Sequence, residues 1–489
     1  MQRDKPVNVW GWGSPGEAVT VNFGETSVKG VADSEGKWKV ILPPQKTSAK
    51  PQDLVVSGKN TITLTDVLVG EVWIGAGQSN MFWPVSESSN PKQEIAGANY
   101  PNIRLFQIPM VPSGTPAEDV DAKWERCSPE TVAKFSAVLY SFGREIHTKL
   151  ENVPIGLIQT AWSGTKIEAW TPPAGFAAIP TIRKELDKIE ELTAAHKSVQ
   201  HSYVAEIKNW TSRAEKAISE GKTIAPPPVA VIPKHPLDSH HSHTGLYNGM
   251  VHAIVPYTIR GVTWYQGEQN VPDKGYYAEL MKGLIKGWRT IWGQGDFPFY
   301  YVQIAPFNYP YPGSFLPELR EAQTKVLAVP NTGMVVTMDI GDLFDIHPLN
   351  KREVGRRLSL VALAKDYGFD EIEHCGPMYA GMSVEGNHVR IRFDHAAGLS
   401  THDGQPLSWF FVAGEDKAFI MADAEIEGET VLLHSPLVKK PVAVRYGWHQ
   451  LAETKLVNSA GLPAVPFRTD NWTETPTGSG MIRLRKTRN

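Results

Sequence analysis

The spacing of apolar residues changes twice along the chain and divides it into three regions. In residues 1–66, short alternating runs such as VNVWGW and AVTVNF are separated by the turn sequences GSPGE and DSEG, which is typical of antiparallel strands. From 67 to 370, near-continuous apolar runs alternate with helical patterns, and from 371 to 489 alternating runs such as HVRIRF return. We therefore predict a central α/β domain between N-terminal and C-terminal regions that resemble β-sandwiches.

The central region predicts a mostly parallel sheet with helices on both faces. Five runs have the continuous apolar character of strands that are buried on both faces: VLVGEVWIGAG, VPIGLIQTAW, IRGVTWYQG, PFYYVQIAPF and TGMVVTMDIG. Helical spacing between them predicts helices at 131–150 and 278–293, as in alternating α/β folds. Residues 174–235 are polar and helical before a proline-rich stretch, so we expect an insertion. Whether the flanking β regions pack with each other or form two modules is open at this stage.

Composition and charge exclude several classes of partner. The 489 residues include 49 basic and 52 acidic side chains and carry a formal net charge of −3, which gives no reason to expect nucleic acid or an anionic membrane as partner. The chain has no apolar stretch near the roughly 20 residues that span a bilayer. It starts in strand-like sequence, and we expect a secreted or periplasmic protein whose signal peptide is absent from this sequence. The two cysteines, Cys127 and Cys375, allow at most one disulfide bridge.

Polar residues follow four of the predicted strands. GQSNM with Ser79 follows the first strand, SGT with Gly164 the second, QGEQN the third and DLFDIHP the last. In an open α/β sheet, ligands bind beyond the carboxyl ends of the strands. The four ends supply a hydroxyl, a flexible glycine, two amides with a carboxylate, and an Asp/His pair. Acyl transfer through a serine needs such a set, although a lone serine after a strand more often caps a helix.

The order of the sequence blocks points to a family. GQSNM, WSGTKIEAW, LYNGM, WYQGEQN and DIHPLNKREVGRR resemble the blocks of sialate O-acetylesterase-type carbohydrate esterases of the SGNH hydrolase superfamily. The flanking β regions are similar as well, so the resemblance covers almost the whole chain. It implies a flavodoxin-like central sheet and a serine esterase that removes acetyl groups from carbohydrate hydroxyls, with no cofactor and no metal. The acetylated carbohydrate is the expected partner, and the oligomeric state is not readable.

The same resemblance implies a catalytic triad. Ser79 would be the nucleophile, His347 its general base, and Asp345 the carboxylate that orients the imidazole. The usual acid of the superfamily lies three residues before the histidine, where this chain has Phe344. The alternatives to Asp345 are a dyad steadied by a backbone carbonyl and two further aspartates, Asp342 and Asp339. Because the imidazole must be neutral to act as base, activity should fall on acidification through about pH 6 to 7.

The oxyanion and the sugar need further groups. The backbone amides of Ser79 and Gly164, with the side-chain amide of Gln266 or Asn270, would bind the oxyanion, and Gln266 is favoured because it opens the QGEQN block. Substrate contacts are expected from Gln78, Asn80, Trp162 and Glu268. Glu268 has a second interpretation, a buried carboxylate that is hydrogen-bonded to the nucleophile turn. Candidates for an aromatic sugar-binding face, each of which could equally belong to the core, are Trp83, Trp162, Trp170 and Trp264.

Three alternatives are kept beside this interpretation. The stretch HPLDSHHSHTG (235–245) holds four histidines and an aspartate, which are zinc ligands, but its spacing is not that of a known hydrolase motif and we predict a surface loop at the rim of the site. The same catalytic set would also serve an acetylxylan or xyloglucan acetylesterase. In a different class, the chain would be a non-catalytic carbohydrate-binding protein with a hydrolase fold.

Overall fold

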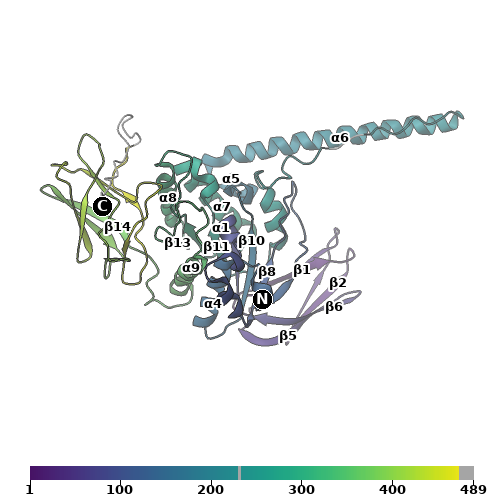
Figure 1. The fold of residues 1–489 in the computed structure, drawn as a ribbon. Coiled ribbons are helices and arrows are strands. Elements are labelled where there is room, and N and C mark those ends of the chain that lie inside the picture. The colour runs from purple at the N-terminus through teal and green to yellow at the C-terminus, as the bar shows by residue number, and fades with distance from the viewer. Residues whose placement is uncertain (230–232, 473–489) are drawn as a thin grey trace.

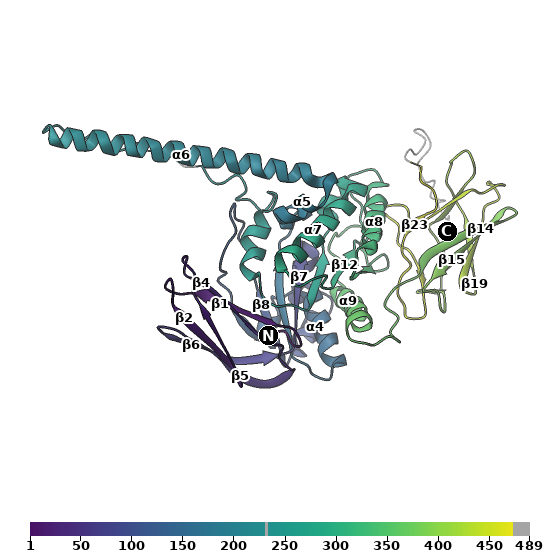
Figure 2. The ribbon, with the colours of Figure 1, turned by 180° about the vertical axis from the view of Figure 1, so that it is seen from behind.

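The computed structural model describes residues 1–229 and 233–472. It shows a central α/β domain with one β module on each side (Figure 1), and the view from behind shows the same arrangement (Figure 2). The two modules have separate apolar cores. Over the residues described, the N-terminal and C-terminal β regions therefore form two modules and do not pack with each other. The last part of the predicted C-terminal region, 473–489, lies outside the described residues.

The central sheet has seven strands in the order β13-β12-β11-β7-β10-β8-β9. All of them run parallel except β9, which pairs antiparallel with β8. Every residue of β7, in the middle of the sheet, is buried. The predicted mostly parallel α/β sheet is confirmed, and the bounds of its strands are β7 (Glu71–Gly77), β8 (Tyr100–Gln107), β9 (Trp124–Cys127), β10 (Ile155–Ala161), β11 (Gly261–Tyr265), β12 (Phe299–Gln303) and β13 (Thr332–Val336).

Helices cover both faces of this sheet. On one face, the ring of Trp73 in β7 meets Phe142 of α4 (Ala137–Lys149) at a centroid distance of 5.0 Å, and α9 (Lys351–Asp366) packs beside α4. On the other face, Phe299 of β12 meets Trp288 of α7 (Tyr277–Trp292) at 6.2 Å. The same face carries α5 (Pro173–Ala178) and α8 (Phe315–Lys325), which pack against α7. The aromatic side chains therefore form two apolar layers around the sheet.

Two of the predicted boundaries were wrong. The helix expected at 131–150 starts at Ala137, because the Ser136 hydroxyl accepts the Leu139 N–H at 3.1 Å and caps it; a separate turn, α3 (Pro129–Val132), precedes it. The insertion expected at 174–235 starts later, because α5 belongs to the central domain. A side chain at Gly175 would lie 2.4 Å from the Gly283 carbonyl oxygen, so α5 and α7 touch through their backbones.

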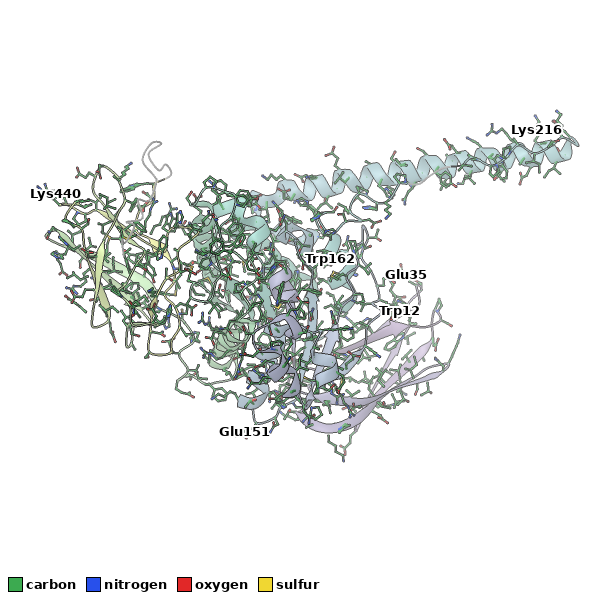
Figure 3. All side chains as sticks on the ribbon, in the orientation of Figure 1. Trp12, Glu35, Glu151, Trp162, Lys216 and Lys440 are labelled. Atoms are coloured by element: carbon green, nitrogen blue, oxygen red, sulfur yellow. The ribbon has the colours of Figure 1, made fainter. Side chains whose placement is uncertain are left out.

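The insertion itself is a single long helix with a return segment. Helix α6 (Arg183–Ser219) has 37 residues and projects away from the domain (Figure 1), with Lys216 toward its far end (Figure 3). Only Leu186, Ile189 and His196, in its inner half, are buried. Among the described residues, α6 and every other helix are too short or too polar to cross a membrane.

The β modules are antiparallel. The N-terminal module pairs β1 (Val7–Trp12) with β4 (Lys37–Leu42), and β2 (Ala18–Phe23) lies between β3 (Thr26–Val31) and β5 (Ser48–Ser57), which continues to β6 (Thr61–Val69). The C-terminal module has two four-stranded sheets and a two-stranded one. Their strands are β14 (Met378–Glu385), β15 (His388–Asp394), β16 (Ser400–Thr401), β17 (Phe410–Ala413), β18 (Ile420–Met421), β19 (Asp423–Glu427), β20 (Thr430–His434), β21 (Ala443–Tyr446), β22 (Leu456–Val457) and β23 (Phe467–Arg468). Cys127 and Cys375 are free thiols.

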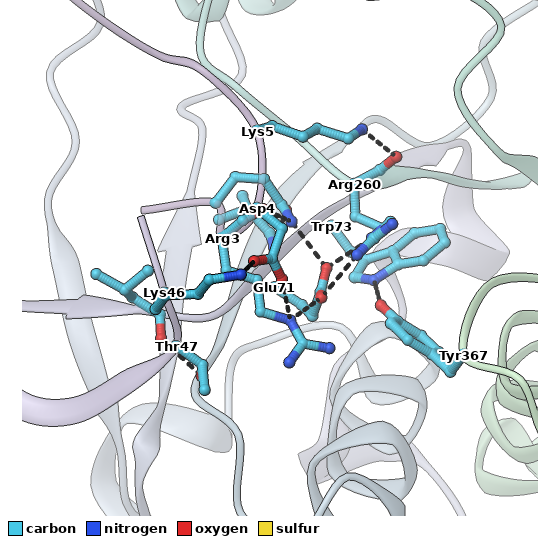
Figure 4. A network of polar contacts seen from close by, with 12 residues as sticks. Arg3, Asp4, Lys5, Lys46, Thr47, Glu71, Trp73, Arg260 and Tyr367 are labelled. Atoms are coloured by element: carbon cyan, nitrogen blue, oxygen red, sulfur yellow. Dashed lines mark hydrogen bonds and ion pairs between the residues drawn. The ribbon is translucent and has the colours of Figure 1, made fainter. Parts of the chain in front are cut away.

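A buried carboxylate joins the start of the chain to the central sheet (Figure 4). Glu71, at the first position of β7, is fully buried. It accepts hydrogen bonds from Arg3 at 2.5 Å, from Gln2 at 2.9 Å, and from Arg260 at 2.8 and 3.0 Å. Burial alone would raise the pKa of Glu71, but the contacts with Arg260, Gln2 and Arg3 outweigh it and leave the pKa below its usual value. The carboxylate is therefore charged, and the guanidinium groups of Arg3 and Arg260 compensate for the burial of that charge.

We predict that Glu71→Gln lowers the free energy of unfolding by about 3 to 5 kcal/mol, because it removes a buried charge from two partly buried guanidinium groups that pair with it. Urea unfolding of the two proteins measures the difference. The matched control is Glu35→Gln in the N-terminal module (Figure 3), whose carboxylate is 74% exposed and pairs only with Lys37; it should change stability by less than about 1 kcal/mol. Equal stability of Glu71→Gln and wild type would contradict this account.

Candidate active site

Ser79 stands where β7 ends. It is the first residue of the short helix α1 (Ser79–Phe82), and 8% of its surface is exposed. The preceding turn is tied to β11, because the Gln78 N–H donates to the Tyr265 carbonyl at 3.0 Å. Gly77 has φ 143°, and a side chain there would lie 2.1 Å from the same carbonyl oxygen. A glycine is therefore required at the point where the chain leaves the sheet and turns to present Ser79.

The loop after β13 brings His347 to this turn. The imidazole stacks on Trp83, just beyond α1, with ring centroids 4.4 Å apart and planes 19° from parallel. The Asn80 amide donates to the Ile346 carbonyl at 3.1 Å. Residues beside Ser79 thus contact His347 itself and its neighbour, although about 270 positions separate the two segments in the sequence.

The three candidate aspartates have different partners. Asp345 Oδ1 lies 3.4 Å from His347 Nδ1 and also accepts the His347 backbone N–H at 2.9 Å. Asp342 accepts the backbone N–H groups of Phe344 and Asp345 and so shapes the loop. Both oxygens of Asp339 are bound by the Arg357 guanidinium, at 2.7 and 2.6 Å. Asp345 is therefore the carboxylate that faces the imidazole, and its side chain is 54% exposed.

The surroundings of His347 favour a neutral imidazole. Burial lowers its pKa below the ordinary value, and the nearby Lys351 ammonium lowers the pKa further, whereas Asp345 raises it. The net pKa lies below the usual 6.5. At neutral pH the ring can therefore accept a proton, as a general base must.

Two backbone amides are available near Ser79. In the part of the chain that the structure describes, the N–H groups of Ser79 and Gly164 donate no hydrogen bond. Gly164 follows β10, is exposed, and adopts a left-handed conformation with φ 70°. A side chain built on it would meet no atom within 4 Å, so the space beside this glycine is open.

Gln266 and Asn270 have other partners. The Gln266 amide donates to the Thr165 carbonyl at 3.0 Å and to Asn270 Oδ1 at 2.6 Å. The Asn270 amide donates to Glu168 and to Asp273, and its oxygen also accepts the Ile167 N–H. Both side chains are completely buried. Because their amide hydrogens are already donated, the expectation that one of them donates to the oxyanion does not agree with the hydrogen bonds observed. They hold the loop that carries Gly164.

A buried polar network lies directly under the nucleophile turn. The Asn80 amide donates to Glu268 Oε1 at 2.5 Å, and its oxygen accepts a hydrogen bond from the Lys351 ammonium. Glu268 is thus hydrogen-bonded to the nucleophile turn, as in the second interpretation of that residue, and it is 7% exposed. The structure places Asn80 and Glu268 in this network and not on an open surface for substrate. Gln78 is also buried, and its side-chain oxygen faces the Gln269 N–H at 3.5 Å.

Lys351 is a buried residue of this network that the sequence analysis did not single out. Its side chain is fully buried, and burial lowers its pKa to about 7. The signal was present in the sequence, because Lys351 shares the spacing of Val354, Leu358 and Val361 along the apolar stripe of α9. A lysine on an apolar stripe is rare unless it has a buried partner.

The predicted aromatic face is only partly observed. Trp170 and Trp264 are completely buried in the core, the second of the two positions expected for them, and so are not part of a sugar-binding face. Trp83 and Trp162 are partly exposed; Trp162 (Figure 3) stacks on His240 at 4.9 Å. The exposed aromatic that the sequence did not single out is Phe344, which is 90% exposed and adjoins Asp345.

The histidine-rich stretch at 235–245 is a loop whose side chains diverge. His240 stacks on Trp162, next to the Gly164 turn, while His243 pairs with Glu185 at 3.1 Å and His235 contacts His196 of α6. Among residues 1–229 and 233–472, no group of three or more His, Cys, Asp or Glu side chains is arranged to hold a metal ion. The loop borders the candidate site through His240.

A family of known proteins matches the central domain of this chain. The family of carbohydrate esterases described as sialic acid-specific acetylesterases matches residues 69–198 and 230–363. The matched segments contain Ser79, Gly164 and His347, and they leave out the outer part of α6.

Individual relatives match over nearly their whole length. The chain is 28% identical to the sialate O-acetylesterase of Mus musculus and 30% identical to that of Rattus norvegicus, in each case across 94% of this chain and 90% of the relative. The crystal structure of a carbohydrate acetylesterase from Xanthomonas citri is 34% identical, with a TM-score of 0.79 over 96% of this chain and 97% of that one. The protein therefore belongs to the sialic acid-specific acetylesterase family, and it is a carbohydrate O-acetylesterase.

Proposed function

We propose that the protein removes acetyl groups from sugar hydroxyls through an acetyl-enzyme on Ser79, in a central domain of the SGNH hydrolase type. The observation that carries the proposal is the contact between the two loops. Trp83 stacks on His347 and Asn80 binds the Ile346 carbonyl, so the nucleophile and the base come from segments that are held against each other. A binding module would not need a neutral imidazole beside a serine at a strand end.

The first half of the reaction uses His347 as base. The neutral imidazole takes the Ser79 proton while Oγ attacks the acetyl carbonyl, and the carbonyl oxygen gains negative charge. The backbone N–H groups of Ser79 and Gly164 donate to this oxyanion. Asp345 stabilises the imidazolium and fixes which ring nitrogen carries the proton. The imidazolium then gives its proton to the departing sugar oxygen, and the acetyl group stays on Ser79.

The second half reverses these roles with water. His347 takes a proton from a water molecule, which attacks the acetyl carbonyl, and the same two N–H groups bind the second oxyanion. Collapse of the intermediate returns the proton to Ser79 and releases acetate. Gln266 and Asn270 do not contact the oxyanion in this scheme. Their hydrogen bonds with Thr165 and Ile167 hold the Gly164 turn in place.

The substrate is an acetylated carbohydrate, and we infer that O-acetylated sialic acid is the first to test because the rodent relatives are named for that activity. Acetylated xylan or xyloglucan is the alternative. Phe344 lies in the His347 loop and is exposed, and Trp162 lies before the Gly164 turn and is partly exposed. Both offer aromatic surface to a sugar. A secreted or periplasmic location is part of the same proposal.

Ser79→Ala should abolish hydrolysis of p-nitrophenyl acetate. Loss of the nucleophile in serine hydrolases lowers kcat by about 10³-fold or more, and the assay of released nitrophenol measures it. Ser86→Ala, an exposed serine beyond the same turn, is the matched control and should keep wild-type activity. If Ser79→Ala hydrolysed the ester as fast as wild type, Ser79 would not be the nucleophile and the proposed mechanism would be wrong.

The pH dependence should follow His347. Because the pKa of His347 in the folded protein lies below the usual 6.5, the midpoint of the fall in kcat/KM on acidification should lie below pH 6.5, toward the acid side of the window of about pH 6 to 7 indicated by the sequence alone. Asp345→Asn should move the acid limb to still lower pH, because Asp345 raises the pKa of His347, and should lower kcat by at least about 10-fold.

Asp342→Asn is the control for that change, since Asp342 binds only loop backbone in the structure, and its acid limb should coincide with that of wild type. An acid limb that does not move in Asp345→Asn would show that a different group orients the imidazole.

Phe344→Ala should raise KM for an acetylated glycan by about 2- to 10-fold, the value of one aromatic contact, with a smaller change for p-nitrophenyl acetate, which has no sugar. The assay measures acetate release from O-acetylated sialic acid and from acetylated xylan. It gives KM and kcat for wild type and for Phe344→Ala on each substrate. Release from xylan alone would favour the plant-polysaccharide alternative.

A further inference from the structure

Four segments of the chain meet at the Asn80 side chain. Asn80 itself belongs to the nucleophile turn, and its amide hydrogens go to Glu268, after β11, and to the Ile346 carbonyl, beside His347. Its oxygen accepts from Lys351, the first residue of α9. Asn80 and Lys351 are 1% and 0% exposed. The Asn80 amide thus joins the serine turn to the histidine loop and to α9.

The chemistry of these partners determines the orientation of the amide. An ammonium group only donates hydrogen bonds, whereas an ionised carboxylate and a backbone carbonyl only accept them. Lys351 therefore requires the Asn80 oxygen, and Glu268 and Ile346 require its nitrogen. If Lys351 were replaced by an apolar residue, Glu268 and Ile346 would still require the amide nitrogen, but the oxygen would be left unpaired in a buried site and the turn would lose its bond to α9.

Lys351 occupies an unfavourable position for a cation. It lies in the first turn of a 16-residue helix, where the helix dipole repels positive charge, and its burial is costly unless a counter-charge compensates it. Glu268 faces it across Asn80, and Glu268 Oε2 has no hydrogen-bond partner among the described residues. The rings of Trp83 and Tyr265 lie 5.8 and 5.7 Å from the ammonium. A core built for stability alone would place an apolar residue here.

We propose that Lys351 is a positioning residue for the esterase reaction: through Asn80 it clamps the Ser79 turn to the His347 loop, and its charge helps to keep His347 in the neutral form. This inference rests on the proposed Ser79–His347 mechanism. The charged groups that act on His347 are Lys351 and Asp345, and those that act on Lys351 are Glu268 and Asp345. Lys351 and Asp345 have opposite effects on the imidazole, since the ammonium favours the neutral ring and the carboxylate favours the protonated one.

The test replaces Lys351 by methionine, which has similar length but neither a charge nor a donor. In Lys351→Met, kcat for p-nitrophenyl acetate should fall by about 10- to 100-fold, as expected for misplaced catalytic groups, with KM little changed. The acid limb of kcat/KM should move to higher pH, because the charge that lowers the pKa of His347 is gone. Lys351→Gln, which retains a donor without the charge, should show the same movement of the acid limb with a smaller loss of kcat.

Arg352→Met is the matched control. It removes a positive charge from the next residue of the same helix, but that side chain is 60% exposed and points to Glu94 at 3.3 Å. Its kcat and its acid limb should equal those of wild type. Circular dichroism and thermal unfolding report whether each variant is folded.

The outcomes separate this inference from the proposed function. If wild type is inactive, or if Ser79→Ala is as active as wild type, the serine mechanism itself fails. If wild type is active and Ser79→Ala is not, but a folded Lys351→Met keeps the wild-type kcat and acid limb, the positioning role is overturned. If Lys351→Met does not fold, Lys351→Gln decides by the same two readouts, and failure of both variants to fold would assign Lys351 to stability alone and overturn the proposal.

Discussion

The parallel pairing of β7 with β10 and β11 is the constraint on which the site depends. Because the three strands run in the same direction, their carboxyl ends lie at one edge of the sheet. This places three segments next to one another: the Ser79 turn, the Gly164 turn and the QGEQN segment. In the sequence they are spread over almost 200 residues. The close approach of Gly77 to the Tyr265 carbonyl shows how tightly the first and third of these segments are joined.

Buried polar contacts do the positioning at this edge. Gln266 and Asn270 donate amide hydrogens to Thr165 and Glu168, in the loop beside Gly164. Asn80 donates to Glu268 and to the Ile346 carbonyl in the histidine loop. Each such group would cost about 1 to 3 kcal/mol if it were left unpaired. The networks therefore tolerate few alternative arrangements. They fix the positions of the loops that carry Ser79, Gly164 and His347, as the proposed acyl transfer would need. The opposite edge of the sheet has its own buried charge, Glu71, which serves the attachment of the N-terminal module.

The modules around the central domain are independent in their packing. Each β module has its own apolar core, and α6 extends far beyond the residues that it buries. The family match omits the outer part of this helix, at 199–229, and the site lies in segments that it includes. Variation in α6 can therefore leave the catalytic geometry intact, since that geometry comes from strand ends inside the sheet.

The amino-acid sequence by itself determined the elements and the chemistry. Apart from Glu71 and one threonine, the runs VLVGEVWIGAG and GVTWY are apolar, and they predicted buried strands. Asn350 caps the start of α9 by accepting the Glu353 N–H at 3.3 Å. The order of blocks around Ser79 and His347 identified the family. Helix boundaries were less certain, because the cap at Ser136 and the close packing of Gly175 are local contacts that periodicity does not express.

Only the tertiary structure decided which polar groups meet. The sequence favours Asp345 but leaves Asp342 and Asp339 as alternatives, and folding brings Asp345 to the imidazole and pairs Asp339 with Arg357. Trp170 and Trp264 are as aromatic as Trp162, yet they fill the core. The apolar stripe of α9 marks Lys351 as an unusual lysine, but only the fold shows that its partner is Asn80, some 270 residues earlier. Hydrogen bonds and burial act between neighbours in space, and a sequence pattern records only neighbours along the chain.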